Sequence, residues 1–196
     1  MNNRRKFVLP LVITLVLLVG VVMAWATYGP TTLPDEFTTG RVTAGELSQR
    51  IVDITASVTS RVEEANQNEL GGHREIAEAL LQEAHDRNYE ARLKALELSD
   101  VLAKLSASLS DIGSRDSRTL AYQSISIELS LVAQYLKYTD SLNRFLELLP
   151  ATFGSLNPSD QEMVIDALAE VNQRAQAINQ LNKAFGDKIR EFDKSL

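Results

Sequence analysis

Apolar residues recur at alternating intervals of three and four along most of the chain, from Thr43 almost to the C-terminus. This spacing places side chains along one side of an α-helix, whereas a half-buried β-strand needs strict alternation of apolar and polar residues. No alternating pattern bounded by turn residues occurs between the helical segments. The pattern therefore predicts an all-α domain.

Cap and turn signals divide the pattern into four segments. A T-x-x-E capping box at Thr43 opens the first segment, a Gly-Gly pair closes it, Pro150 follows the third, and an Asn-Pro pair opens the fourth. The expected helices cover 43–71, 73–112, 116–149 and 157–192. Because short loops between long helices force neighbours to be antiparallel, we expect an elongated up-down-up-down four-helix bundle over residues 43–196.

The same spacing predicts which side of each helix is buried. The first helix is expected to bury Leu47, Ile51, Ile54, Val58, Val62 and Ala65. The second is expected to bury Ala77, Leu81, Ala84, Asn88, Ala91, Ala95, Leu98, Leu102, Leu105, Leu109 and Ile112. The third is expected to bury Leu120, Ile127, Leu131, Tyr135, Tyr138, Leu142, Phe145 and Leu149, and the fourth Val164, Leu168, Val171, Ala175, Ile178, Asn182, Phe185, Ile189 and Phe192.

An apolar segment at 7–26 precedes the bundle and predicts an N-terminal transmembrane helix. Positions 7–25 contain no charged residue, and at about 1.5 Å per residue they span roughly 28 Å, which is close to the thickness of a bilayer core. The outer interface would then hold the aromatic residues Trp25 and Tyr28, which suit a headgroup layer.

The basic residues fix the predicted orientation of this helix. Arg4, Arg5 and Lys6 lie in the flank formed by residues 1–6, and the next basic residue is Arg41. Because basic residues stay on the cytoplasmic side, we expect the N-terminus inside and the bundle outside the cytoplasmic membrane. Residues 27–42, which are rich in Pro, Gly and Thr, are expected to form a flexible linker.

A cleaved signal peptide is the alternative interpretation of the N-terminal segment. Ala24, Trp25 and Ala26 form an A-x-A-like cleavage site after a basic flank, although the apolar run is longer than in an ordinary signal peptide. Cleavage after Ala26 would leave a soluble secreted or periplasmic protein. Both interpretations place residues 27–196 outside the cytoplasm.

Charge and composition exclude several classes of function. The chain of 196 residues has a net charge of -6; its first 26 residues hold three basic and no acidic residues, which leaves 17 basic against 26 acidic residues, net -9, in the remainder. This acidity disfavours nucleic acid and anionic lipid as partners, so attachment to the membrane falls to the N-terminal helix. With no cysteine, the domain relies on packing instead of disulfides.

The sequence contains no motif for catalysis or cofactor binding. It lacks G-x-S-x-G, H-E-x-x-H and Gly-rich phosphate loops, so we expect no enzyme activity and no cofactor. A carboxylate-bridged metal site in a bundle would need Glu-x-x-His, which is absent. The two histidines, His73 and His85, are expected to be a helix start and a surface residue, and Met163 is expected to fill the core.

Four tyrosines, Tyr89, Tyr122, Tyr135 and Tyr138, follow helical spacing in the second and third helices. They suit a groove for a small ligand, because tyrosine joins an apolar ring to a hydroxyl group. The simpler interpretation is that they lie half-buried with their hydroxyl groups in water, and we favour it. We therefore expect no small-molecule ligand.

The fourth helix carries an unusually large number of uncharged amides on its outer side. These residues are Asn172, Gln173, Gln176, Asn179 and Gln180. Because the centres of protein interfaces are depleted in charge, these five residues form a candidate interaction face. An ordinary polar helix surface is the alternative.

Two further asparagines occupy seam positions, Asn88 in the second helix and Asn182 in the fourth. A polar residue at such a position can select register or oligomeric state at a cost in stability. Rotation of either side chain out of the seam is the alternative. We therefore treat both residues as candidates for setting register.

Together these features predict a single-pass membrane protein whose helical bundle acts outside the cytoplasm as a scaffold or protein-interaction module. Its partner would be another protein or a second copy of the chain. The alternative function is a ligand-sensing or solute-binding bundle, which would have to signal through a partner because no second membrane helix or output domain follows the bundle in this sequence.

Overall fold

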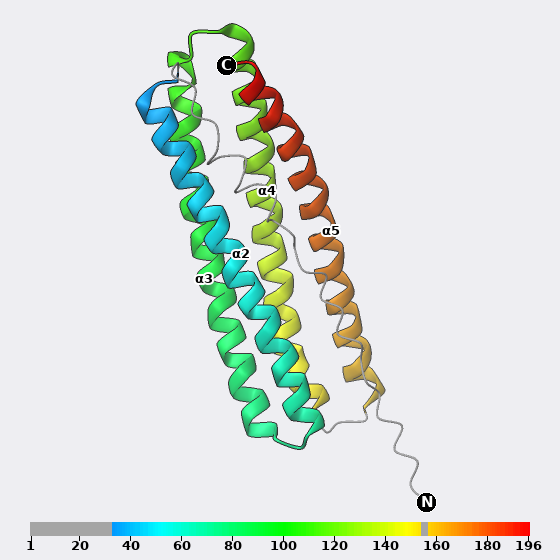
Figure 1. The fold of residues 1–196 in the computed structure, drawn as a ribbon. Coiled ribbons are helices and arrows are strands. Elements are labelled where there is room, and N and C mark those ends of the chain that lie inside the picture. The colour runs from blue at the N-terminus through cyan, green and yellow to red at the C-terminus, as the bar shows by residue number, and fades with distance from the viewer. Residues whose placement is uncertain (1–32, 154–156) are drawn as a thin grey trace, which may run out of the picture.

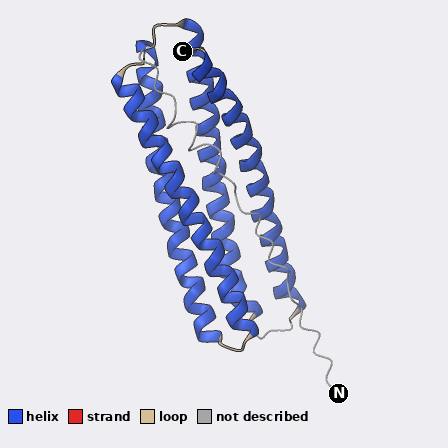
Figure 2. Cartoon of the chain, viewed as in Figure 1, coloured by secondary structure: helices blue, strands red, loops and turns tan. Residues whose placement is uncertain are grey.

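The structure of the protein is a computed structural model that describes residues 33–153 and 157–196. All long elements in these residues are α-helices, and these two ranges contain no strand (Figure 2). The prediction of an all-α domain is therefore confirmed for them. The helices are α2 (Asp35–Leu70), α3 (Arg74–Ala107), α4 (Arg115–Leu148) and α5 (Pro158–Lys194), and short 3-10 segments, η1 (Ser108–Asp111) and η2 (Leu149–Thr152), extend α3 and α4.

The helices lie side by side in an elongated bundle, and consecutive helices run in opposite directions (Figure 1). Close backbone approaches are most frequent within two hairpins, α2 with α3 and α4 with α5. The hairpins meet along α3 and α4, whereas α2 and α5 make few close backbone approaches. The antiparallel bundle expected from the short connections is thus the architecture of the described residues.

Two predicted helix boundaries coincide with their sequence signals. α2 ends at Leu70, and Gly72 adopts a φ of 82°, a conformation that glycine enters without steric cost. α5 begins at Pro158, and the side chain of Asn157 accepts a hydrogen bond from the backbone N–H of Ser159 at 3.1 Å. These contacts satisfy backbone groups that a helix end leaves unpaired.

The predicted start of the first helix is wrong by eight residues. α2 begins at Asp35, so residues 35–42 of the predicted linker 27–42 are helical. Thr43 does not cap a helix; its hydroxyl donates to the carbonyl of Thr39 at 3.1 Å inside α2. The helix extends because Phe37 and Arg41 continue the buried spacing beyond Thr43, which outweighs the low helix propensity of the local Thr and Gly residues.

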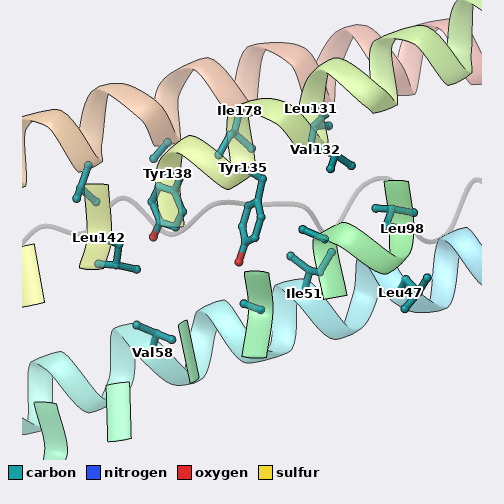
Figure 3. Packing of buried hydrophobic residues seen from close by; sticks show 14 of the residues in the cluster. Leu47, Ile51, Val58, Leu98, Leu131, Val132, Tyr135, Tyr138, Leu142 and Ile178 are labelled. Carbon is teal, nitrogen blue, oxygen red and sulfur yellow. The ribbon is translucent and has the colours of Figure 1, made fainter. Parts of the chain in front are cut away.

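The buried sides predicted for the second and fourth helices are confirmed throughout. All the seam residues named for them are buried, from Ala77 to Ile112 and from Val164 to Phe192. They form one core with the inner residues of α2 and α4, and Figure 3 shows part of that core around Tyr135 and Tyr138.

The predicted buried sides of the first and third helices need correction. In α2 the seam passes through Thr55, and Ile54 is only partly buried. In the first half of α4, Leu120 and Ile127 are partly buried, whereas Ser124 and Glu128 lie in the core. Counting back from Leu131 in steps of three and four reaches Glu128 and Ser124. The prediction instead followed the nearest apolar residues, Ile127 and Leu120, and was therefore displaced from the true seam.

None of the helices in the described ranges is long and apolar enough to span a bilayer. The predicted membrane helix at 7–26 and its markers Arg4, Arg5, Lys6, Trp25 and Tyr28 lie outside the described residues, as do residues 27–32 of the predicted linker.

Candidate functional site

The outer side of α5 lacks charge over residues 175–182, which contain no acidic or basic side chain. Gln176 and Gln180 are exposed within this stretch, and Gln173 is exposed just before it, next to Arg174. Outer surfaces elsewhere carry ion pairs, such as Arg87 with Glu90 at 2.9 Å and Lys94 with Glu97 at 2.8 Å on α3. The uncharged stretch is therefore a local departure from the charged surface of the bundle.

The five predicted interface amides do not share one environment. The three glutamines are exposed, but Asn172 and Asn179 are half-buried, and their Oδ1 atoms are buried without a hydrogen-bond partner in the described residues. Both asparagines precede Asp193 by multiples of seven residues, and Asp193 pairs with Arg41 of α2. Because steps of seven return to the same side of a helix, these two asparagines lie on the side of α5 that faces α2.

A second uncharged stretch, which the sequence analysis missed, lies on α4. Residues 119–136 contain a single charged residue, Glu128, and that side chain is buried. The exposed residues here include Gln123, Ser126, Ser130 and Ala133. The sequence does show eighteen positions with one charged residue. Because that residue, Glu128, would ordinarily be assigned to the surface, the stretch is recognisable as uncharged on its outside only once Glu128 is known to be buried.

The two uncharged stretches lie beside each other on the α4–α5 hairpin (Figure 1). Ser141 of α4 donates a hydrogen bond to Glu170 of α5 at 3.0 Å, which fixes the relative height of the two antiparallel helices. About ten residues before Ser141 and ten after Glu170, both helices are in their uncharged stretches. We give the name uncharged surface to the following exposed residues of the two stretches together with the neighbouring Gln173: Gln123, Ser126, Ser130, Ala133, Gln173, Gln176 and Gln180.

The structure places both candidate register residues inside the bundle. Asn88 is buried, and its Nδ2 atom donates to the carbonyl of Thr139 at 2.8 Å and to Oδ1 of Asn143 at 2.6 Å. These bonds join α3 to α4 at one height. Asn182 is buried on the seam of α5. That either residue selects a register or an oligomeric state stays a prediction.

Two charged side chains lie in the core, although the sequence pattern did not predict them there. Arg41 and Glu128 are the charged side chains among the buried residues of the described ranges, at 3% and 2% exposure. Burial raises the pKa of Glu128 to about 8, against the opposing effects of a hydrogen bond with Ser48 and the charge of Arg41. Glu128 therefore carries its proton at neutral pH.

The tyrosines divide into two exposed and two buried residues, so their predicted half-burial is wrong. Tyr89 and Tyr122 are exposed, whereas Tyr135 and Tyr138 extend from α4 into the core (Figure 3). Tyr135 and Thr55 share a hydrogen bond of 2.6 Å between their hydroxyl groups. Burial raises the pKa of Tyr138 to about 12, and that of Tyr135 also rises because of burial.

A small cavity beside Ser48 and Tyr135 has a volume of about 20 Å³, enough for one water molecule. A larger groove of about 500 Å³ is open to solvent between the start of α2 and the end of α3, beside Gly40 and Lys104. Neither space is shaped to enclose a small ligand.

The two histidines lie twelve residues apart in the chain, one just before α3 and one within it. His73 precedes α3, and Nε2 of the partly exposed His85 is 3.8 Å from Oε1 of Glu147. Within residues 33–153 and 157–196, no group of three or more His, Cys, Asp or Glu side chains is arranged to hold a metal ion.

Comparison with known proteins gives no family to which the chain can be assigned. No family model, no curated protein and no solved structure matches it. The candidate site therefore rests on the geometry of the bundle alone.

Proposed function

We propose that the protein is a single-pass membrane protein whose helical bundle acts outside the cytoplasm as a scaffold that binds a partner protein through the uncharged surface. The observation that carries the proposal is the adjacency of the two uncharged stretches on α4 and α5. The apolar segment at 7–26 and its basic flank support the membrane anchor and its orientation.

Electrostatics favour this surface as the contact site. The chain is acidic, with a net charge of -6, so association through its charged faces would bring together groups that are strongly hydrated. Burial of amides, hydroxyl groups and small apolar side chains requires much less desolvation than burial of charges. The exposed glutamines of α5 also retain hydrogen-bonding capacity for a partner.

Co-purification with matched charge variants tests the contact. The full-length protein, solubilised in detergent, is compared with a variant in which Gln173, Gln176 and Gln180 are all changed to Glu. We expect the variant to keep its helical circular dichroism but to lose most of its partner, because three new charges would have to be desolvated at the contact. The partner is identified by mass spectrometry, and self-association is measured by light scattering.

A control variant separates contact from added charge. Ala56, Ser60 and Gln67 are exposed on α2, away from the uncharged surface, and changing all three to Glu adds the same charge. This variant should retain the partner. Equal retention by both variants would show that the α5 glutamines are an ordinary polar surface, and equal loss would show a general effect of charge.

The membrane topology is tested separately. A reporter enzyme that is active only outside the cytoplasm, fused after Leu196, should be active, because the basic residues precede the apolar segment. Activity of a cytoplasm-specific reporter at the same position would contradict the proposed orientation. The mass of the mature protein distinguishes an anchor from a signal peptide, since cleavage after Ala26 would leave Thr27 as the first residue.

A further inference from the structure

The side of α3 that faces away from the core carries a second heptad seam. From Gln82 to Ala107 the spacing alternates between four and three residues, and every residue at these positions is exposed. Spacing of this kind lines up side chains in one strip along a helix, as in the contact between two helices of a coiled coil. We call these residues the outer seam: Gln82, Asp86, Tyr89, Leu93, Leu96, Asp100, Ala103 and Ala107.

The centre of the outer seam is apolar. Tyr89, Leu93 and Leu96 leave 58%, 42% and 45% of their surface exposed, and they occupy positions i, i+4 and i+7 of the helix. None of the three belongs to the core, because the buried seam of α3 passes through Ala91 and Ala95 instead. Large apolar residues at this spacing suit docking against the apolar side of another helix.

Both ends of the apolar centre are acidic. Asp86 and Asp100 bracket it and lie about 21 Å apart along the helix axis. Nε2 of Gln82 donates to Oδ1 of Asp86 at 3.0 Å, whereas the carboxylate of Asp100 makes no hydrogen bond within the described residues. The outer seam itself contains no basic residue.

The neighbouring basic residues of α3 do not neutralise these two aspartates. Three of them form ion pairs with other acids: Arg87 with Glu90, Lys94 with Glu97, and Arg92 with Asp140 of α4. A fourth, Lys104, lines the open groove beside α2. No ion pair of the described residues includes Asp86 or Asp100. The outer seam therefore presents an apolar strip with a negative charge at each end.

A second copy of α3 does not fit this charge pattern. Overlap of the apolar centres of two outer seams brings the aspartates of one copy close to those of the other, whether the helices run parallel or antiparallel. Like charges at a contact are unfavourable. A helix with positive charges at the matching positions would pair with both aspartates and cover the apolar centre.

We propose that the outer seam binds an amphipathic helix of a partner protein, whose apolar strip carries a basic residue at each end. The apolar side chains of that helix cover Tyr89, Leu93 and Leu96, and its two basic residues pair with Asp86 and Asp100. This contact lies on α3, apart from the uncharged surface of α4 and α5, so it does not rest on the function proposed above.

A synthetic peptide serves as the defined probe. It spans about three heptads, with leucine at its seam positions and lysine at two seam positions two heptads apart. Two versions carry a single cysteine beyond one or the other lysine. Fluorescence anisotropy measures the affinity of the peptide for the full-length protein in a non-ionic detergent, with micelles alone as the blank.

Disulfide cross-linking locates the bound peptide, because the chain itself has no cysteine. Ala103→Cys places a thiol on the outer seam, three residues beyond Asp100, and Ser60→Cys places one at an exposed position of α2. We expect one version of the peptide to form a cross-link at position 103 and neither version to form one at position 60.

Matched variants test the apolar contribution. Leu93→Gln with Leu96→Gln should weaken binding of the peptide about tenfold or more, because its apolar anchors are removed. Met163→Gln with Ile165→Gln, at similarly exposed apolar positions of α5, should leave the affinity unchanged. Helical circular dichroism checks the fold of each variant.

A charge reversal tests the acidic ends. Asp86→Lys with Asp100→Lys should shift the preference of the protein to a peptide with glutamate in place of lysine, because attraction and repulsion are exchanged. Glu63→Lys with Asp166→Lys changes the net charge equally at exposed positions of α2 and α5, and should keep the preference for lysine.

Three results would overturn the proposal. The absence of a cross-link at position 103 with both versions would show that the peptide does not occupy the outer seam. Equal affinity of the wild-type protein for the lysine and glutamate peptides would show that the aspartates do not select a basic helix. A dimer in light scattering that Leu93→Gln with Leu96→Gln dissociates would assign the outer seam to a second copy of the chain.

Discussion

The two halves of the bundle follow the same heptad spacing with different core chemistry. The terminal half, which contains the start of α2 and the end of α5, buries Arg41, Ser48 and Glu128 among its leucines and phenylalanines. The turn half, which contains the Gly71-Gly72 turn, buries alanines from three helices, including Ala65, Ala77, Ala84 and Ala167. Spacing alone therefore fixes which positions are buried, but it leaves open what holds them together.

The difference affects how specifically each half is assembled. Apolar contacts are non-directional, so small residues such as the alanines of the turn half tolerate small shifts between helices. Hydrogen bonds and ion pairs need a particular geometry. The Arg41–Asp193 pair connects α2 with α5 in the terminal half, the Thr55–Tyr135 bond connects α2 with α4 near mid-height, and the bonds of Asn88 connect α3 with α4 in the turn half. The buried Arg41–Asp193 ion pair thus gives the terminal half specificity in the pairing of α2 with α5, at a cost in desolvated charged groups.

The largest effect is expected from a new charge in either core. Leu102 of the terminal half and Ala84 of the turn half are both fully buried. Changing either to Asp should lower the free energy of unfolding by about 3 kcal/mol or more, because the added carboxylate has no partner. Urea unfolding of residues 33–196, followed by circular dichroism, measures this. If Leu102→Asp left the free energy of unfolding unchanged, the terminal half would accept any polar group in its core. The buried polar residues there would then not distinguish it from the turn half.

Truncation tests the helical residues that composition assigned to a linker. A fragment that begins at residue 43 lacks Phe37 and Arg41, whereas one that begins at residue 33 keeps the whole of α2. The shorter fragment should lose about 2–3 kcal/mol of stability, because Phe37 is no longer buried and Phe192 becomes exposed. Thermal unfolding of the two fragments checks this. Equal melting temperatures would mean that the first turns of α2 add nothing to the terminal half.

Glu128 should make stability depend on pH. Its pKa is raised to about 8 in the folded state, so between the pKa of the unfolded chain and that value the folded protein binds one more proton than the unfolded chain. Stability therefore falls as pH rises through this window, by about 1.4 kcal/mol for each pH unit. Urea titrations at several pH values measure the slope.

Glu128→Gln should remove this contribution to the slope, and Glu147→Gln, at an exposed carboxylate, is the matched control. If the slope of Glu128→Gln equalled that of the wild type, the buried acid would not be the source of the pH dependence.

The hydrogen bond between Thr55 and Tyr135 is expected to give the smallest effect. Thr55→Val removes one hydroxyl group and leaves that of Tyr135 buried without its partner, which should cost about 1–3 kcal/mol. Adding Tyr135→Phe should recover part of that loss, because both polar groups are then absent. A double-mutant cycle by urea unfolding gives the coupling. Strictly additive losses would show that the pair contributes no directional preference to the packing of α2 against α4.

The sequence was most informative where polar and apolar residues followed their usual environments. The seams of α3 and α5 were predictable residue by residue, because leucine, alanine and isoleucine at the expected spacing are all buried. Prediction failed at Arg41 and Glu128, since charged residues are normally assigned to the surface and only the packed bundle shows them inside.

The start of α2 and the α4 part of the uncharged surface could not be predicted from the sequence, because both depend on contacts between helices. Threonine and glycine before residue 43 favour a loop locally, and the tertiary contacts of Phe37 override that preference. The α5 part of the uncharged surface was predictable from its amides. The α4 part required knowing that Glu128 is buried, and the adjacency of the two parts required the height at which Ser141 meets Glu170.

The contacts between α2 and α4 have a consequence for how the chain folds. Thr55 and Tyr135 are separated by 80 positions, as are Ser48 and Glu128 one heptad away, whereas the two hairpins close over short turns. Closing a long loop has a larger entropic cost than closing a short one, so we expect the hairpins to form first and to dock later. Hairpins that dock out of step by one helical turn would bury Glu128 and the Tyr135 hydroxyl without these partners, and they would separate again. We therefore expect these pairs to select against misaligned hairpins late in folding, where a purely apolar interface would let such hairpins persist.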